Sequence, residues 1–312
     1  MTSGKPSLSR LGIAIAGLRG GSGKTLATLG LIAALERRDI SVAPFKKGPD
    51  YIDPAWLSLA AGRDCHNLDT YLLDPETIMQ SYLTRNSYCQ VALVEGNRGI
   101  FDGIDAEGTH SIAELAKLLG LPVILVVDCT KASRTVAALV RGCQAFDPGL
   151  ALRGVILNRV AGERHRSIAA GAIERYCGIP VLGAIPRIPG LDLKERHLGL
   201  LPVHEHPAPG QVVGLIADEV EASVDISRVL GIMEQHEYPS FTIDVKEQPW
   251  AASEGDEATG PAIGIIRDSA FSFYYPENIE ALRRHGARII EVDSLRDQQL
   301  PAVEGLYIGG GF

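Results

Sequence analysis

Short apolar runs alternate with helical stretches from the start of the chain to Ala184. The runs are hydrophobic at every position rather than at alternate ones, which indicates strands buried on both faces of a parallel sheet. Strands and helices in regular alternation predict a doubly wound α/β domain, with ligands at the carboxyl ends of the strands. The predicted strands are residues 11–16, 41–45, 91–94, 123–127, 154–157 and 181–184, and the predicted helices are residues 24–38, 75–84, 112–119, 130–146 and 165–176.

The pattern changes after Leu201, where prolines punctuate a loop and a helical stretch follows to about Gln235. Residues 247–261 are polar and read as a linker. A second strand–helix–strand series then begins and stops at Phe312, too short to close a domain. The predicted organisation is a first domain over residues 1–205, a helical connector and linker over 206–260, and the truncated start of a second α/β domain over 261–312.

The segment Gly-Leu-Arg-Gly-Gly-Ser-Gly-Lys-Thr, residues 17–25, joins the first predicted strand to the first predicted helix. Glycines let backbone N–H groups turn toward an anion, and the following helix presents its positive end. Lys24 is predicted to reach the β- and γ-phosphates of a nucleotide, and the Thr25 hydroxyl to bind magnesium. The spacing departs from the usual phosphate-loop rule by one residue, because Gly17 supplies the first glycine.

Two segments after neighbouring strands offer acidic partners for that metal. Lys46 and Lys47 precede a Gly-Pro turn with Asp50 and Asp53, and Glu95 begins a glycine-rich run after the third predicted strand. Both segments leave a parallel sheet beside the loop, which favours a phosphate and metal site. The alternative is that each acidic residue caps a turn.

Composition and charge restrict the partners and the cellular location that can be expected. The 312 residues carry a formal net charge of −8, which argues against nucleic acid as the main partner. No apolar run is long enough to span a bilayer and residues 1–10 are too polar for a signal peptide, so a cytoplasmic protein without a membrane partner is expected. The five cysteines are scattered and form no Cys-x-x-Cys pair, which makes a disulfide framework unexpected.

Several segments, in order, resemble the cobyrinic acid a,c-diamide synthase family, whose ATP-binding half is similar to dethiobiotin synthetase. The second unit resembles the opening of that family's glutamine amidotransferase domain, and the resemblance covers nearly the whole chain. The matching segments are the loop at 17–25, GPDYIDP at 48–54, EGNRGIFDG at 95–103, LNRV at 157–160, IPR at 185–187, ERHLGL at 195–200, RDSAFSFYYPEN at 267–278 and LYIGGGF at 306–312.

The resemblance implies an amidoligase that uses ATP and Mg²⁺ to convert side-chain carboxylates of a tetrapyrrole into amides through an acyl phosphate, with glutamine as the ammonia donor in the full-length enzyme. Cobyrinate or hydrogenobyrinate is the implied substrate. By carry-over, Thr25, Asp50 and Glu95 hold magnesium, Lys24 and Lys46 contact the transferring phosphate, and Asn158 meets the adenine edge. The implied nucleotide site is Gly17, Gly20, Gly21, Ser22, Gly23, Lys24, Thr25, Asn158 and Pro186; the catalytic residues are Lys24, Lys46, Asp50 and Glu95; the substrate-side residues are Tyr51, Asp53, Arg98 and His197.

The glutamine-hydrolysing machinery of the family is expected to be missing. All five cysteines precede residue 178 and none sits in a Gly-x-Cys-x-Gly turn, so the sequence is either a fragment, which is the expectation, or the product of a truncated gene. Two alternatives stay open: an amidase acting on siroheme or nickel-sirohydrochlorin, and a switch ATPase of the partitioning type. Arg19 stands where that second group carries a lysine that reaches a dimer partner. The sequence leaves open whether the protein is a homodimer.

Overall fold

Seven parallel strands form the central sheet of the computed structural model, which describes residues 11–188, 191, 195–196, 199–239 and 260–311. Their order is β3-β2-β4-β1-β5-β6-β7, so β1 is central, with β2 to β4 on one side and β5 to β7 on the other. The prediction of a doubly wound parallel sheet is confirmed. The strands are β1 (Gly12–Gly17), β2 (Val42–Lys47), β3 (His66–Leu68), β4 (Val91–Glu95), β5 (Val123–Asp128), β6 (Leu152–Val160) and β7 (Val181–Pro186).

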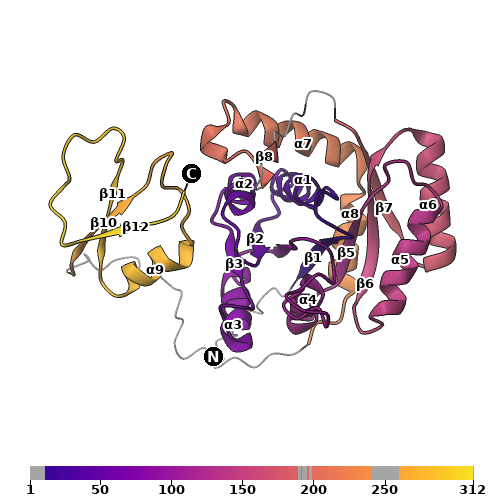
Figure 1. Cartoon of the computed structure of the whole chain (residues 1–312). Helices are drawn as coiled ribbons and strands as arrows, with labels where there is room; N and C mark the ends of the chain where they lie inside the picture. Colours follow the sequence, from indigo (N-terminus) through magenta and orange to yellow (C-terminus); the bar gives the residue numbers. More distant parts are fainter. Residues whose placement is uncertain (1–10, 189–190, 192–194, 197–198, 240–259, 312) are drawn as a thin grey trace, which may run out of the picture.

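Helices cover both faces of this sheet (Figure 1). One hydrophobic cluster joins one sheet face to α3 (Pro75–Asn86), α4 (Ile112–Leu119), α5 (Thr135–Phe146) and α6 (Glu163–Cys177). A second cluster joins the other face to α1 (Lys24–Glu36), α2 (Ile52–Ala61), α7 (Pro209–Ser223) and α8 (Ile226–Gln235). No helix in the described ranges is long and apolar enough to cross a membrane.

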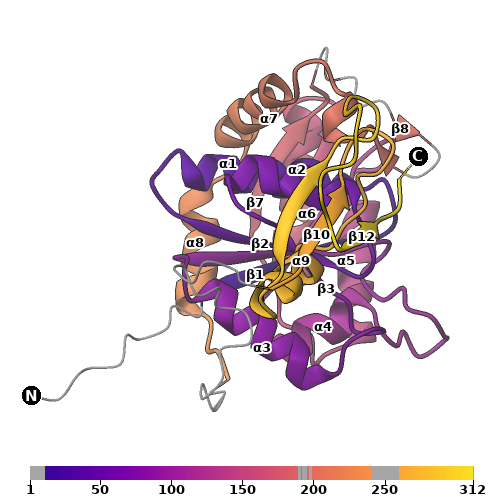
Figure 2. The ribbon, with the colours of Figure 1, turned by 90° about the vertical axis from the view of Figure 1, so that its left-hand side faces the viewer.

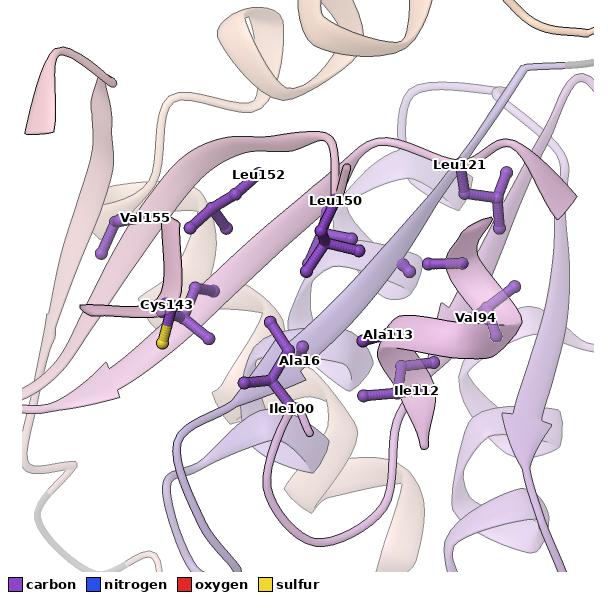
Figure 3. Packing of buried hydrophobic residues seen from close by; sticks show 14 of the residues in the cluster. Ala16, Val94, Ile100, Ile112, Ala113, Leu121, Cys143, Leu150, Leu152 and Val155 are labelled. Atoms are coloured by element: carbon purple, nitrogen blue, oxygen red, sulfur yellow. The ribbon is translucent and has the colours of Figure 1, made fainter. Parts of the chain in front are cut away.

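The first cluster anchors the loop that follows β4. Ala16 of β1, Val94 of β4 and Ile112 of α4 are buried in it together with Ile100, which belongs to that loop (Figure 3). A Cβ atom at Gly96 would lie 2.9 Å from the side chain of Ile112. The close packing of this loop on α4 holds the chain in place directly after Glu95.

Two elements next to the site, α2 and β3, were not among the predicted ones. The segment read as a site loop continues into α2, because Asp50 Oδ1 accepts hydrogen bonds from the N–H groups of Ile52 and Asp53 at 3.0 and 3.1 Å. Pro54 lies in the first helical turn, where the missing N–H costs nothing. The triplet His66–Leu68 begins with two polar residues and is long enough for only three pairs with β2.

The expected helical connector is part of the first unit's core. Helices α7 and α8 replace one predicted stretch, and Asp225 caps α8 by accepting the N–H of Arg228 at 3.0 Å. Gly30 lets α7 approach α1 closely, since a Cβ atom there would lie 2.2 Å from Val220.

Between β7 and α7 lie the short strands β8 (Glu195–Arg196) and β9 (Gly199–Leu200) and a 3₁₀ turn at Val203–Glu205. Most of the expected linker at 247–261 falls outside the described residues.

The second unit is a three-stranded parallel sheet in the order β11-β10-β12 with one helix, α9. Its elements are β10 (Ala262–Ile266), α9 (Pro276–Arg284), β11 (Arg288–Val292) and β12 (Gly305–Ile308). Its core is small: Ile265, Tyr274 and Ile279 are its buried members. Both views place it beside α2, α3 and β3 (Figures 1 and 2).

Hydrogen bonds, an ion pair and ring stacking join the units. Glu280 of α9 accepts hydrogen bonds from both terminal nitrogens of Arg85, at 3.0 and 2.5 Å, and its Oε1 lies 3.1 Å from His66 Nε2. Burial raises the pKa of Glu280, but the hydrogen bonds from His66 and Arg85 outweigh it and lower the pKa to about 2. The ring of Tyr51 stacks on Phe273 at 5.1 Å and on Tyr275 at 4.7 Å between centroids.

We expect Glu280→Gln to loosen the docking of α9 on the first unit. Charge-assisted hydrogen bonds contribute about 1.5–3 kcal/mol each to stability, so backbone amides of α9 should exchange hydrogen about ten-fold faster or more. Hydrogen–deuterium exchange followed by mass spectrometry measures this.

Glu291→Gln is the matched control, because Glu291 pairs with Arg267 at 3.2 Å within the second unit and both side chains are about half exposed. Exposed pairs contribute about 0–1 kcal/mol. Equal exchange in the two variants would contradict the predicted role of Glu280.

Candidate functional site

A cavity of about 680 Å³ opens at the carboxyl ends of β1, β2, β4, β6 and β7, where the strand order reverses around β1. The loop between β1 and α1 forms one wall. Lys24, Thr25, Lys46, Asp50 and Glu95 all line this cavity. The residues predicted as catalytic are therefore brought together by the fold.

The loop closes over its own side chains. Gly23 has φ 93°, in the left-handed region that favours glycine, and a Cβ atom there would lie 2.0 Å from Asn158 Nδ2. Ser22 is buried, and its hydroxyl donates to the Arg19 carbonyl at 2.9 Å. Ser22 thus shapes the loop, whereas Gly20, Gly21 and Gly23 line the cavity. Gly17 ends β1, with its Cα facing Ser22 and Lys24.

The Lys24 side chain folds back across the loop. Its Nζ donates to the Arg98 carbonyl at 2.7 Å and to the Arg19 carbonyl at 3.2 Å. Burial lowers the pKa of Lys24, and the charge of Glu95 opposes that shift. The ammonium is thus held by two neutral carbonyls at the cavity wall. An anion that enters the cavity can replace these carbonyls as its hydrogen-bond partner.

Lys46 is the centre of a buried charge cluster. Its Nζ lies 2.6 Å from Asp53 Oδ2, 2.8 Å from Glu95 Oε1 and 3.7 Å from an oxygen of Asp50. Thr25 Oγ1 lies 2.7 Å from the same Glu95 oxygen and 3.3 Å from Asp53 Oδ2. The Lys46 and Glu95 side chains are 2% and 0% exposed, so these charges interact with little screening by water.

Burial and neighbouring charge compete within the cluster. Burial alone lowers the pKa of Lys46, but the carboxylates of Glu95 and Asp53 outweigh it and raise the pKa above its ordinary value. Burial raises the pKa of Glu95, with Lys46 opposing. The ammonium of Lys46 therefore stays charged at every physiological pH and balances the carboxylates.

The positions of the two aspartates differ from those that the sequence suggested. Asp53, predicted for the substrate side, lies within hydrogen-bond reach of Thr25 and Lys46. Asp50, predicted as a metal ligand, also caps α2, and burial raises its pKa. Both carboxylates line the cavity.

The oxygen donors fit a magnesium ion. Glu95 Oε2 is buried without a hydrogen-bond partner, and it stands beside the Thr25 hydroxyl and the Asp53 carboxylate. Magnesium favours hydroxyl and carboxylate oxygens and is usually held by one or two carboxylates together with substrate phosphates. The described residues contain no group of three or more His, Cys, Asp or Glu side chains arranged to hold a metal ion.

The far end of the cavity lies at β6 and β7. Asn158 donates from Nδ2 to the Ser22 carbonyl at 2.9 Å, and Pro186 lines the wall. Arg159 and Arg187 line the cavity as well but were not predicted. Arg159 bonds the Gly21 carbonyl and Asp128, at 3.0 and 2.9 Å. Arg159 lies at the carboxyl end of β6 and Arg187 directly follows β7, and that position was the available signal.

The other three residues predicted for the substrate side lie in different places. Arg98 lines the cavity and is largely exposed, with a left-handed φ of 44°. The ring of Tyr51 stacks on aromatic rings of the second unit. His197 lies outside the described residues.

None of the cysteines has the surroundings of a nucleophile. All five are buried in the first unit, and burial raises the pKa of each thiol, most strongly at Cys65.

Comparison with known proteins is consistent with both units. The family model described as "CobQ/CobB/MinD/ParA nucleotide binding domain" matches residues 13–200, and "CobB/CobQ-like glutamine amidotransferase domain" matches residues 262–312. The chain belongs to the cobyrinic acid a,c-diamide synthase family. The residues predicted to bind a nucleotide thus lie in a nucleotide-binding domain of that family.

Three curated relatives illustrate the similarity. The cobyrinate a,c-diamide synthase of Magnetococcus marinus is 44% identical over 96% of this chain and 64% of its own length. The enzyme of that name from Archaeoglobus fulgidus is 39% identical over 96% and 64%. The hydrogenobyrinate a,c-diamide synthase of Brucella ovis is 42% identical over 96% and 67%. The chain therefore spans about 64% of the length of the first two relatives.

We expect Lys46→Met to destabilise the first unit by about 3–5 kcal/mol, because it leaves two buried carboxylates without their counter-charge. Adding Glu95→Gln should restore part of that loss, since one of those charges is then removed. Urea unfolding followed by circular dichroism measures both differences.

Lys117→Met serves as the control, because Lys117 pairs with Glu114 and Asp147 at 2.7 and 2.9 Å while its side chain is 35% exposed. Its loss should cost about 1 kcal/mol or less. Strictly additive effects of Lys46→Met and Glu95→Gln would show that the two side chains are not coupled.

Proposed function

We propose that the protein is an ATP-dependent amidoligase that converts side-chain carboxylates of a tetrapyrrole, cobyrinate or hydrogenobyrinate, into amides. The observation that carries this proposal is the direct contact between its two units at Tyr51, one residue from Asp50 at the nucleotide cavity. A phosphate-binding site and a glutamine amidotransferase-like unit thus meet on one short segment. The names of the relatives support the same activity.

The chemistry runs in two steps. A carboxylate oxygen of the acceptor attacks the γ-phosphorus of ATP, and the bond to the β-phosphate oxygen breaks to give an acyl phosphate and ADP. Ammonia then attacks the acyl carbon, loses a proton and displaces phosphate, leaving an amide. Phosphorylation is needed because a carboxylate is a poor electrophile with no good leaving group.

Positioning and charge neutralisation are the protein's contribution. Lys24 leaves its two carbonyl partners to meet the γ-phosphate, and Lys46 balances the negative charge that gathers at the transferring group. Thr25, Glu95 and the two aspartates would hold a magnesium ion. When bound, that ion would neutralise charge on the β- and γ-phosphates.

The ammonia source is the second part of the proposal. In the full-length enzyme, glutamine hydrolysed in the amidotransferase-like domain supplies ammonia to the acyl phosphate. The match of residues 262–312 and the docking of this segment on β3, α2 and α3 support that arrangement. The description shared with MinD and ParA does not separate a ligase from a switch ATPase, but the amidotransferase-like match favours the ligase.

We expect ATP turnover by the full-length protein to require cobyrinate or hydrogenobyrinate together with glutamine or ammonium. Lys24→Ala should lower turnover at least about a hundred-fold, since it removes a cation aligned with the transferring phosphate. Phosphate release and mass spectrometry of the tetrapyrrole follow the two products.

Lys117→Ala, at an ion pair of α4 that does not line the nucleotide cavity, should leave turnover unchanged. ATP hydrolysis stimulated by DNA or lipid vesicles and indifferent to tetrapyrroles would overturn the proposal in favour of a switch ATPase.

A further inference from the structure

A second cavity of about 570 Å³ adjoins the nucleotide cavity and shares Asn97 and Arg98 with it. It lies at the carboxyl ends of β2, β3 and β4, where Lys47 ends β2 and Asp69 follows β3. The shared wall is also where Lys24 Nζ meets the Arg98 carbonyl at 2.7 Å. A molecule that extends past Asn97 and Arg98 therefore reaches from one cavity into the other.

The wall of this cavity carries polar groups without partners. Lys47 is only 7% exposed, and in the described ranges its ammonium makes no hydrogen bond; burial lowers its pKa, and the charge of Asp69 opposes that shift. Asp69 is 5% exposed, and its Oδ2, like Asn97 Oδ1, is buried without a hydrogen-bond partner. A buried ammonium without a hydrogen bond costs free energy, which points to a ligand that brings an acceptor oxygen to Lys47.

The mouth of the cavity is apolar. Tyr71, Leu72 and Ile104 line it and are 68%, 62% and 65% exposed. His110 stands edge-on to the Tyr71 ring at 5.6 Å and is fixed by Thr70 Oγ1 at 3.0 Å from its Nδ1. Apolar surface around a few convergent polar groups is the usual composition of a small-molecule site.

We propose that this second cavity binds the acceptor, a broad apolar macrocycle that carries several carboxylates. Its ring system lies against Tyr71, Leu72 and Ile104, and one carboxylate pairs with Lys47. A neighbouring carboxylate passes Arg98 into the nucleotide cavity, where it is phosphorylated. This inference rests on the proposed function and adds the site at which the tetrapyrrole is held.

The test measures cobyrinate binding to the full-length protein and its variants by equilibrium dialysis. Ile104→Asp and Tyr71→Ala should weaken binding about ten-fold or more, because one sets a negative charge against the acceptor's carboxylates and the other removes apolar contact. Lys47→Met should weaken it similarly by removing the counter-charge. Affinity for a non-hydrolysable ATP analogue should stay within about two-fold in Ile104→Asp and Tyr71→Ala.

Tyr88→Ala is the matched control, because Tyr88 is also 68% exposed but precedes β4, at the opposite end of the strands. Both Tyr71 and Ile104 lie on the surface, so their variants remain informative if Lys47→Met does not fold.

Cobyrinate binding that is unchanged in Ile104→Asp and Tyr71→Ala would overturn the assigned site and leave the proposed function standing. If the wild-type protein binds neither cobyrinate nor hydrogenobyrinate and shows no tetrapyrrole-dependent ATP turnover, the proposed function fails and this inference fails with it.

Discussion

The site depends on one buried cation. Lys46 ends β2 with its ammonium between Glu95 of β4 and Asp53 of α2, and Glu95 in turn holds the Thr25 hydroxyl of α1. Carboxylates buried this deeply would repel each other and take up protons without that charge. Because Lys46 supplies the counter-charge that draws them together, oxygen donors from three elements stay converged at the mouth of the phosphate loop.

The same segment connects this cluster to the rest of the molecule. Asn67 donates from Nδ2 to the carbonyls of Gly48 and Asp50, at 2.8 and 2.9 Å, while its own N–H meets Glu277 of the second unit at 3.2 Å. Tyr51 adds its stack on two aromatic rings of that unit. The second unit therefore rests on the backbone that presents Asp50 and Asp53, so its docking and the geometry of the cluster are mechanically linked.

Much of the fold could be predicted from the chain because continuous apolar runs are an unambiguous signal of buried parallel strands. All six predicted strands of the first unit exist, with ends shifted by a few residues. Helix α2 was missed because Asp50 and Pro54 signal a turn as readily as a helix start, and its capping needs the observed geometry. Strand His66–Leu68 has only one apolar residue, and its burial comes from the packing of Leu68, pairing with β2 and contact with the second unit.

By itself the sequence determined the phosphate loop, the strand-to-helix context around it, and the convergence of Lys46 and Glu95, since the ends of parallel strands meet at one edge of a sheet. Only the tertiary structure decided that Asp53 approaches Thr25, that the Tyr51 ring belongs to the interface, and that Lys47 faces a separate cavity. The physical reason is that neighbours in sequence diverge: Lys46 and Lys47 alternate across the strand, so adjacent lysines point to opposite sides of the sheet. Spacing along the chain predicts which residues lie at the same edge of the sheet, but not the direction in which each side chain points.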